Sequence, residues 1–319
     1  MMQKRSRRRK TLKELNLLDR FLFNEVLEDP STYQAVLEII LGHDIRLKAG
    51  VQSEKEVRTL PTFRGIRLDV WGQDEEENIY NSEMQGKNTR NLPRRSRYYQ
   101  SVLDAGLLEP GVVDFNELNN VWLITIAPFD LFGGKRCLYT FRMRCDEVPS
   151  LRLEDGAVRM FLYTKGTVTD GCSRELLEFL QYVEQSDGQK AAECESQRLK
   201  KLHDRVCAVK SNDEVEVRFM QLWEEKALER LEGRHEGRLE GRQEGAEVKL
   251  IEQVCKKLRK GKAAGEIAED LEEDLEKVSQ ICEAARKFAP EYDCDEIYKE
   301  LWGDPDEIED EEDYVEEYE

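Results

Sequence analysis

The spacing of apolar residues predicts helices at the start of the chain and strands after them. From residue 13 to residue 41, leucine, valine and isoleucine recur at intervals of three and four, with a break at Asp29-Pro30 and an end at Gly42. From about residue 51 to residue 86 the pattern changes to alternation, which is typical of β-strands. An acidic turn at 74–77 separates the run 66–71 from a second run at 78–85, so this region predicts a β-hairpin.

Strict alternation sorts the side chains of the first hairpin strand between two faces. We expect one face to carry Ile66, Leu68 and Val70. The opposite face then carries Asp69, with an arginine and a tryptophan as its neighbours at positions 67 and 71.

The rest of the chain contains one more helix and several strands before it becomes helical throughout. Asn91 as a cap and Pro93 in the first turn predict a helix that runs to Leu108. Runs rich in β-branched and aromatic residues at 121–127, 137–144 and 157–163 predict further strands. Beyond Cys172, patterns rich in glutamate, lysine and leucine predict helices over 172–186, 190–232 and 247–287. This order indicates an α/β domain followed by an all-helical C-terminal extension.

Charge is distributed unevenly along the chain. The net charge is −19, yet the last 19 residues hold eleven acids and no base, whereas the first 13 hold seven bases and no acid. The overall acidity therefore does not exclude a polyanionic substrate at the N-terminal half. The eight cysteines form no Cys-x-x-Cys pair and only three histidines are present, which argues against a zinc site. No apolar run reaches the roughly 20 residues of a membrane span, and no signal-type segment follows the basic start, so we expect a cytoplasmic protein without a membrane partner.

The hairpin carries the residues with the clearest chemical potential. Glu83 and Gln85 are two apart on the second strand, so their side chains share a face. If Asp69 on the adjacent strand lies opposite Glu83 or one step diagonal to it, the two carboxylates can share a divalent cation. The backbone carbonyl of Met84 is a further candidate ligand, and Mg²⁺ (or Mn²⁺) is the expected cofactor.

These motifs together resemble the PD-(D/E)XK nuclease superfamily. A helix, Arg-Leu-Asp-Val on one strand, Glu-Met-Gln on the next and a basic helix with Arg-Tyr-Tyr are similar, more narrowly, to the Rpn recombination-promoting nucleases or putative transposases, over about residues 13–165. The resemblance implies a mixed central sheet flanked by helices, with Asp69 and Glu83 as the metal-binding acids and Asp69, Glu83 and Gln85 as the catalytic residues. Gln85 stands where that family usually has lysine, and Lys87 is a candidate for the missing cation.

The resemblance also implies a third acid from the first helical region. Glu38 is the candidate, with Glu25 and Asp44 as alternatives that the sequence leaves open.

Basic residues after the second hairpin strand are candidates for DNA contacts. Arg90, Arg94 and Arg97 recur at spacings of four and three, and Arg95, Lys87 and Tyr98 extend the group. Such a row would hold the phosphate backbone without reading bases. The basic N-terminal arm, residues 1–12, is expected to be disordered.

The helical extension contains a repeat of Glu-Gly-Arg with a period of four between residues 232 and 245. On one helix this places like charges at i,i+4 and adds four glycines, both of which disfavour an isolated helix. We therefore expect homo-oligomerisation, of coiled-coil type, through residues of about 215–250; a flexible charged connector is the alternative.

After the basic arm, the sequence predicts four segments. The α/β domain spans 13–170, a helical region 171–246, a small helical bundle 247–300 and an acidic disordered tail 301–319. The bundle has the rhythm of a helix-turn-helix, but its second helix is acidic, so we expect it to contact protein instead of DNA. Its core positions are expected at residues 267, 271, 275, 278 and 281.

The expected function is that of a Mg²⁺-dependent DNA endonuclease with low sequence specificity. The resemblance implies a link to recombination or mobile elements. The alternative is a noncatalytic DNA-binding or assembly protein that keeps the nuclease fold. No residue distinguishes RNA from DNA as the substrate.

Overall fold

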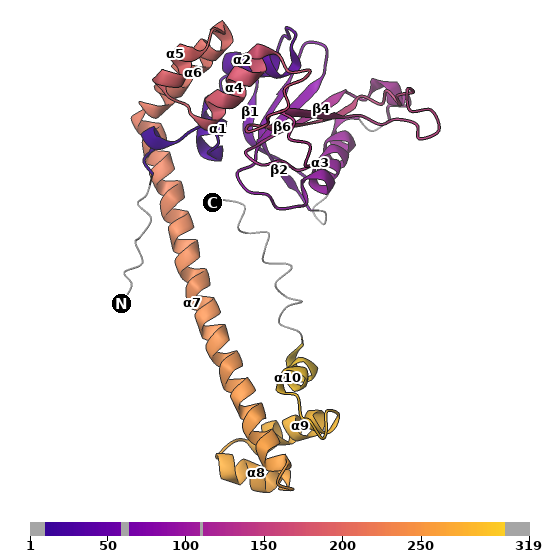
Figure 1. Ribbon diagram of the computed structural model, residues 1–319, viewed down its shortest axis with the longest axis vertical. Coiled ribbons are helices and arrows are strands. Elements are labelled where there is room, and N and C mark those ends of the chain that lie inside the picture. Colours follow the sequence, from indigo (N-terminus) through magenta and orange to yellow (C-terminus); the bar gives the residue numbers. More distant parts are fainter. Residues whose placement is uncertain (1–9, 59–63, 109–110, 304–319) are drawn as a thin grey trace. The chain divides into compact units, whose positions relative to one another are not determined.

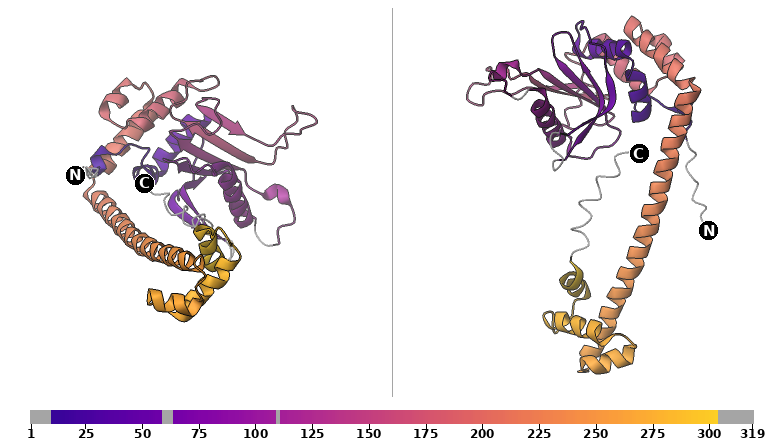
Figure 2. Two further views of the ribbon diagram at one scale, coloured as in Figure 1. Left: turned by 60° about the horizontal axis from the view of Figure 1, so that its bottom comes forward. Right: turned by 180° about the vertical axis from the view of Figure 1, so that it is seen from behind.

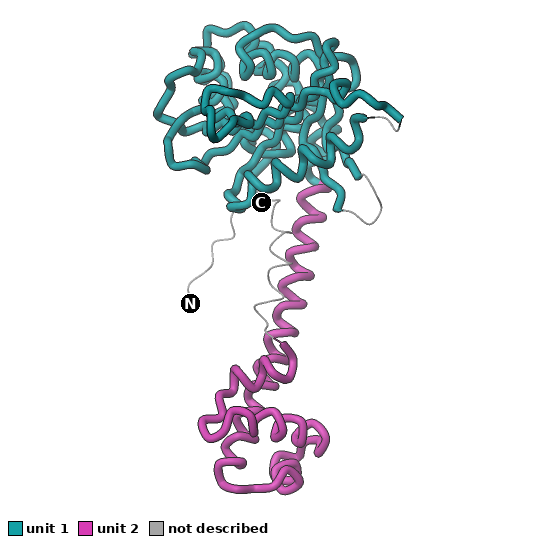
Figure 3. Tube along the Cα trace, turned by 90° about the vertical axis from the view of Figure 1, so that its right-hand side faces the viewer, with its two compact units in different colours: residues 1–220 teal, residues 221–319 magenta. Residues whose placement is uncertain are grey.

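A computed structural model describes residues 10–58, 64–108 and 111–303. The expected basic arm up to residue 9 and the acidic tail from residue 304 lie outside the described residues. The chain divides into two compact units, residues 1–220 and 221–319 (Figure 3). Within the described ranges, no helix is both long enough and apolar enough to cross a membrane.

Unit 1 is built on one mixed sheet of six described strands, in the order β1-β2-β3-β4-β6-β5 (Figure 1). Their bounds are Gln52–Val57, Ile66–Gln73, Ile79–Met84, Val121–Ala127, Leu138–Phe141 and Ala157–Tyr163 for β1 to β6. The pairs β1·β2, β2·β3 and β5·β6 are antiparallel, and β3·β4 and β4·β6 are parallel. The expected α/β class and the hairpin of β2 and β3 are therefore confirmed.

Helices cover both faces of this sheet. On one face, α1 (Arg20–Leu27), α2 (Pro30–Leu41), α4 (Arg174–Glu184), α5 (Gly188–Glu193) and α6 (Gln197–Lys210) share a hydrophobic core with alternate residues of the strands. On the other face, α3 (Leu92–Leu107) packs through Val102 and Leu103 on a second cluster (Figure 2). The catalytic candidates lie between these two layers.

The first helical region begins later than its apolar spacing predicts. Residues Leu12–Glu14 form a short 3-10 turn, η1, and the α-helix starts only at Arg20, because Asp19 caps it by accepting a hydrogen bond from the N–H of Phe21. The break between α1 and α2 lies where it was predicted. Asp29 caps α2, and Pro30 is the first residue of that helix. Gly42 ends α2 with φ 77°, a left-handed conformation that glycine adopts without strain.

The boundary between the units differs from the one that the sequence suggested at residue 170. The apolar faces of α4 and α6 pack in the same core as α1 and α2; Leu202 and Val206, for example, are fully buried there. Residues 171–220 thus belong to unit 1.

In the same unit, a short 3-10 turn, η2 (Phe115–Glu117), leads into β4.

The helical repeat region is one continuous helix, α7, from Asp213 to Leu258. It is followed by α8 (Ala264–Leu271), α9 (Leu275–Arg286) and α10 (Cys294–Trp302). These three helices pack on the end of α7 around Ile251, Val254 and Ile267, which are fully buried. Of the predicted bundle core, Val278 and Ile281 are buried as well, but Leu275 is 55% exposed because it is the first residue of α9 and faces outward.

Candidate functional site

Asp69 and Glu83 lie side by side where β2 and β3 stop pairing. The register of the two strands runs from Gln73↔Ile79 to Val70↔Ser82, so Asp69 and Glu83 are the next opposed pair. At this pair, hydrogen bonds from backbone N–H groups to the two carboxylates take the place of the backbone–backbone hydrogen bonds between the strands. The N–H of Asp69 donates to Oε1 of Glu83 at 3.2 Å, and the N–H of Met84 donates to Oδ2 of Asp69 at 2.9 Å.

The alternation of β2 changes at Asp69, which corrects the prediction of one apolar face. Ile66 and Leu68 pack in the cluster beneath α3, whereas Val70 packs in the core on the α1–α2 face. Asp69 therefore lies at the switch between the faces and is fully buried, while Glu83 is only 7% exposed. A polar side chain of a hairpin face would ordinarily be solvated.

Glu83 is held by two amide side chains of its own strand region. Asn81 donates from Nδ2 to Oε1 of Glu83 at 2.9 Å, and Gln85 donates from Nε2 to Oε2 at 3.5 Å. The expectation that Glu83 and Gln85 share a face agrees with this contact. Asn81, fully buried, was missed by the sequence reasoning, although its position two residues before Glu83 places it on the same strand face.

An arginine from each helical layer reaches the two acids. Nε of Arg20, at the start of α1, lies 2.5 Å from Oδ1 of Asp69. Arg95 of α3 lines a small, open hollow together with Glu83, Asn81 and Thr125. Arg20 was not among the candidates from the sequence, because it belongs to a helix that only the fold brings to β2.

Burial and proximity change the proton affinities of both acids. Burial raises the pKa of Asp69 and the charge of Glu83 raises it further, while Arg20 and the N–H of Met84 act in the opposite direction. Burial also raises the pKa of Glu83, against the hydrogen bond from Asn81 and the charges of Arg95 and Arg20. A pair of acids with raised pKa values in a partly enclosed site is typical of functional carboxylates.

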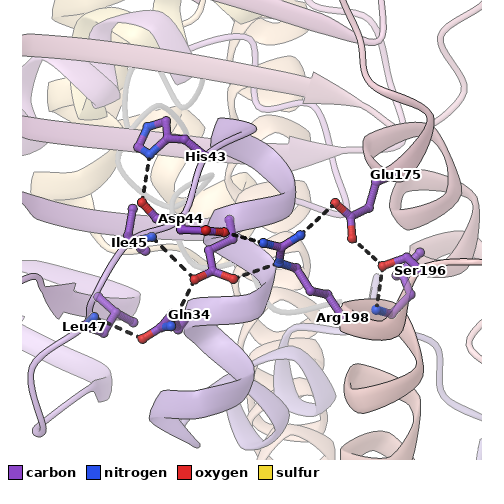
Figure 4. Close-up of polar contacts among 10 residues, drawn as sticks. Gln34, His43, Asp44, Ile45, Leu47, Glu175, Ser196 and Arg198 are labelled. Atoms are coloured by element: carbon purple, nitrogen blue, oxygen red, sulfur yellow. Dashed lines mark hydrogen bonds and ion pairs between the residues drawn. The ribbon is translucent and has the colours of Figure 1, made fainter.

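Glu38, the candidate third acid, is engaged elsewhere. Its carboxylate accepts a hydrogen bond from Nε of Arg198 at 2.8 Å, and the same guanidinium pairs with Asp44 and Glu175 at 2.6 and 3.3 Å (Figure 4). The alternative Glu25 pairs with Arg218 at 2.5 Å. In the described part of the chain, no group of three or more His, Cys, Asp and Glu side chains is arranged to hold a metal. The structure thus brings Asp69 and Glu83 together but does not add a third acid.

The predicted basic row is only partly on one helix. Arg94 and Arg97 are exposed on α3, whereas Arg90 precedes the helix with φ 59°. Lys87 is exposed in the connection after β3. The hydroxyl of Tyr98, which is 39% exposed, donates to the carbonyl of Arg64 at 2.6 Å. Of the predicted basic row, Arg95 is the residue that lies beside the acids, although the sequence analysis named it only as an extension of the row.

The donor atoms at the acid pair fit a hard divalent cation. Asp69 and Glu83 supply carboxylate oxygens, and the carbonyl of Met84 belongs to the residue whose N–H already contacts Asp69. Mg²⁺ is commonly bound by one or two carboxylates together with water and phosphate oxygens. A two-acid site is therefore compatible with Mg²⁺ or Mn²⁺ and unsuited to zinc, which prefers nitrogen and sulfur ligands.

Comparisons with known proteins give no relative: no family model, no curated protein and no solved structure matches this chain.

Proposed function

We propose that the chain hydrolyses phosphodiester bonds of DNA with the help of a divalent cation held by Asp69 and Glu83. The observation that carries this proposal is the opposed, buried pair of carboxylates at the point where β2 and β3 separate. Burying two like charges is costly unless cations compensate for them. Arg20 and Arg95 offset only part of this cost, since the pKa values of both acids remain raised. Such a pair is therefore a reason to expect a cation-binding function.

The hydrogen bonds suggest how each residue contributes. Oε1 of Glu83 accepts two hydrogen bonds and Oδ2 of Asp69 accepts one from Met84, which fixes the orientation of both carboxylates. Oε2 of Glu83, which only the long contact from Gln85 reaches, is then the oxygen most open to a cation, and Oδ1 of Asp69 would exchange its contact with Arg20 for one with the cation. A divalent cation at such a site neutralises charge on the phosphate and lowers the pKa of water. Gln85, next to Oε2, would orient the attacking water by hydrogen bonding, and exposed Lys87 would add positive charge.

Substrate binding is assigned to the basic residues of and before α3. Arg94 and Arg97 are exposed on this helix, and Arg95 lines the hollow beside Glu83. Guanidinium groups in this arrangement favour contacts with the phosphate backbone, which carry no base information. Low sequence specificity and an affinity that falls with added salt are expected.

Cleavage of a supercoiled plasmid with Mg²⁺ or Mn²⁺ tests the proposal. Asp69→Asn and Glu83→Gln should each abolish cutting, whereas Glu56→Gln, which removes an exposed carboxylate from the neighbouring strand β1, should cut like the parent. The binding of Mn²⁺ to the same three variants, measured by calorimetry, separates loss of the cation from loss of the chemistry. Cutting that survives in both acid variants would assign the activity to another site or protein.

A noncatalytic DNA-binding or assembly protein is the second candidate. Its support is the contact of Arg20 with Asp69, which already supplies a positive charge to the pair, and the glutamine at position 85. Unchanged DNA binding with no cutting in any metal would favour this candidate. A parallel assay with single-stranded RNA decides between the two nucleic acids.

A further inference from the structure

The middle of α7 is exposed on every side. Each residue from 228 to 246 is exposed, and the leucines Leu228, Leu231 and Leu239 are 59, 61 and 52% exposed. The segment 228–246 therefore lacks the tertiary packing that stabilises most helices and that the two ends of α7 have. Its glycines at 233, 237, 241 and 245 weaken it further, by about 1 kcal/mol each.

The charges of this segment do not stabilise it from within. Glutamates and arginines of the repeat meet only their own kind at i,i+4, which is unfavourable. In the part of the chain that the structure describes, Glu232, Arg234, Glu236 and Arg238 form no ion pair with another residue. The segment therefore carries apolar and charged groups whose interactions must come from outside the helix.

These groups are arranged symmetrically around His235. With about 100° of rotation per residue, Leu231 and Leu239 lie on either side of His235 on one face, and Leu228 extends the same stripe. Glu232 and Glu236 flank this stripe on one side and Arg234 and Arg238 flank it on the other. We call the stripe of Leu228, Leu231, His235 and Leu239 the seam; Gly233 and Gly237 lie on the opposite face.

The two charged flanks distinguish between parallel and antiparallel pairing. In a parallel pair, a two-fold axis runs along the helices, so the glutamate flank of one chain faces the arginine flank of the other. In an antiparallel pair, the axis is perpendicular to the helices and each flank faces its own copy, glutamate against glutamate. Opposite charges beside an apolar seam set the orientation and the partner of paired helices.

We propose that α7 pairs with α7 of a second copy of the chain, in parallel and in register, through the seam of Leu228, Leu231, His235 and Leu239. A second copy is the occupant because the segment is complementary to itself: the two flanks carry equal numbers of opposite charges at matching angles. Pairing buries the leucine side chains away from water, and each glutamate flank of one chain faces an arginine flank of the other. The proposal does not depend on the nuclease activity.

A charge-swapped chain tests the orientation. The full-length variant Glu232→Arg, Arg234→Glu, Glu236→Arg and Arg238→Glu has the composition of the parent and the same seam. A parallel pair remains complementary in each homodimer, but a mixed pair of parent and swapped chains places like charges on both flanks. Antiparallel pairing gives the reverse result, with mixed pairs favoured over both homodimers.

The measurement is native mass spectrometry of the two chains, carrying different tags and refolded together. Sorting into homodimers, with mixed dimers at least about tenfold below random mixing, is expected for the parallel seam. Random or preferential mixing, or a parent that sediments as a monomer at tens of micromolar concentration, would overturn the proposal. Arg234→Glu with Arg238→Glu should abolish the dimer, whereas Glu244→Arg, opposite the seam, should leave it intact. Circular dichroism confirms that each variant remains helical.

Discussion

Replacing Glu83 by glutamine should stabilise the protein at neutral and basic pH. The glutamine amide has the shape of the carboxylate, and its oxygen can still accept the hydrogen bonds from the N–H of Asp69 and Nδ2 of Asn81 at the Oε1 position. The hydrogen bond lost is the one from Gln85, which is long at 3.5 Å. The main change is thus the removal of one negative charge beside fully buried Asp69.

The size of this effect follows from the separation of opposed side chains. Facing residues of antiparallel strands lie about 5 Å apart at Cβ, and two unit charges at that distance repel by about 3 kcal/mol at an effective dielectric constant of about 20. Arg20 and Arg95 offset part of this repulsion. We therefore expect the free energy of unfolding to rise by about 1–3 kcal/mol at pH 8 in Glu83→Gln.

The pH dependence gives the sign of the effect. Because the pKa values of Asp69 and Glu83 are raised by folding, the folded protein retains protons that the unfolded chain has already released. The parent should accordingly lose stability as the pH rises above the ordinary pKa values of these acids, by about 1.4 kcal/mol for each unit of upward shift. The advantage of Glu83→Gln should be small at pH 5 and largest at pH 8.

Urea titrations in EDTA at pH 5 and pH 8, followed by tryptophan fluorescence, measure the gain in unfolding free energy of Glu83→Gln and the dependence of that gain on pH. Glu56→Gln serves as the control and should change neither value, since Glu56 is exposed on β1. Adding Mn²⁺ at pH 8 should stabilise the parent, by about 2.7 kcal/mol at one hundred times the dissociation constant, and should leave Glu83→Gln unchanged. Equal stability losses of Glu83→Gln at both pH values would refute the reasoning, because repulsion within the pair would then be absent.

Three further substitutions or reactions examine other parts of unit 1. Tyr33→Phe removes a buried hydroxyl that lies 3.1 Å from Oγ of Ser82, so the free energy of unfolding should fall by about 1–2 kcal/mol in urea titrations; an unchanged midpoint would contradict this contact. Glu38→Gln should lower stability by about 1 kcal/mol through its lost ion pair with Arg198 and leave Mn²⁺ affinity unchanged in calorimetry, whereas a tenfold weaker affinity would restore Glu38 as a ligand. Cys207, which is exposed on α6, should be alkylated by iodoacetamide before the buried cysteines, as peptide mapping would show; uniform labelling would imply that unit 1 opens readily.

Local patterns in the sequence were sufficient to predict much of the fold. The helix from Asn91 to Leu108 and the strands at 121–127 and 157–163 agree closely with α3, β4 and β6. These elements are defined by signals within a few residues, namely caps, prolines and β-branched runs. The hairpin was predicted for the same reason, and the short turn restricted Asp69 to a place opposite or diagonal to Glu83; the structure shows the opposed register.

Local patterns misplaced features that depend on contacts between distant segments. The start of the first helix was predicted too early, because leucines at 15 and 17 are buried in the core without being helical. The helices α4 and α6 were assigned to the extension although their apolar faces complete the core of unit 1. A helical apolar stripe shows that a face is buried but does not identify the surface that buries it.

The sequence by itself determined that two acids and an amide stand on adjacent strands of a hairpin, because alternation and a short turn act over neighbouring residues. Only the tertiary structure decided their surroundings. It turned Asp69 between the two faces of β2, brought Arg20 and Arg95 to the acids from opposite layers, and held Glu38 away from them through Arg198. The physical reason is that charge and burial at a site are sums over all neighbours in space, and those neighbours come from segments whose separation along the chain carries no local signal.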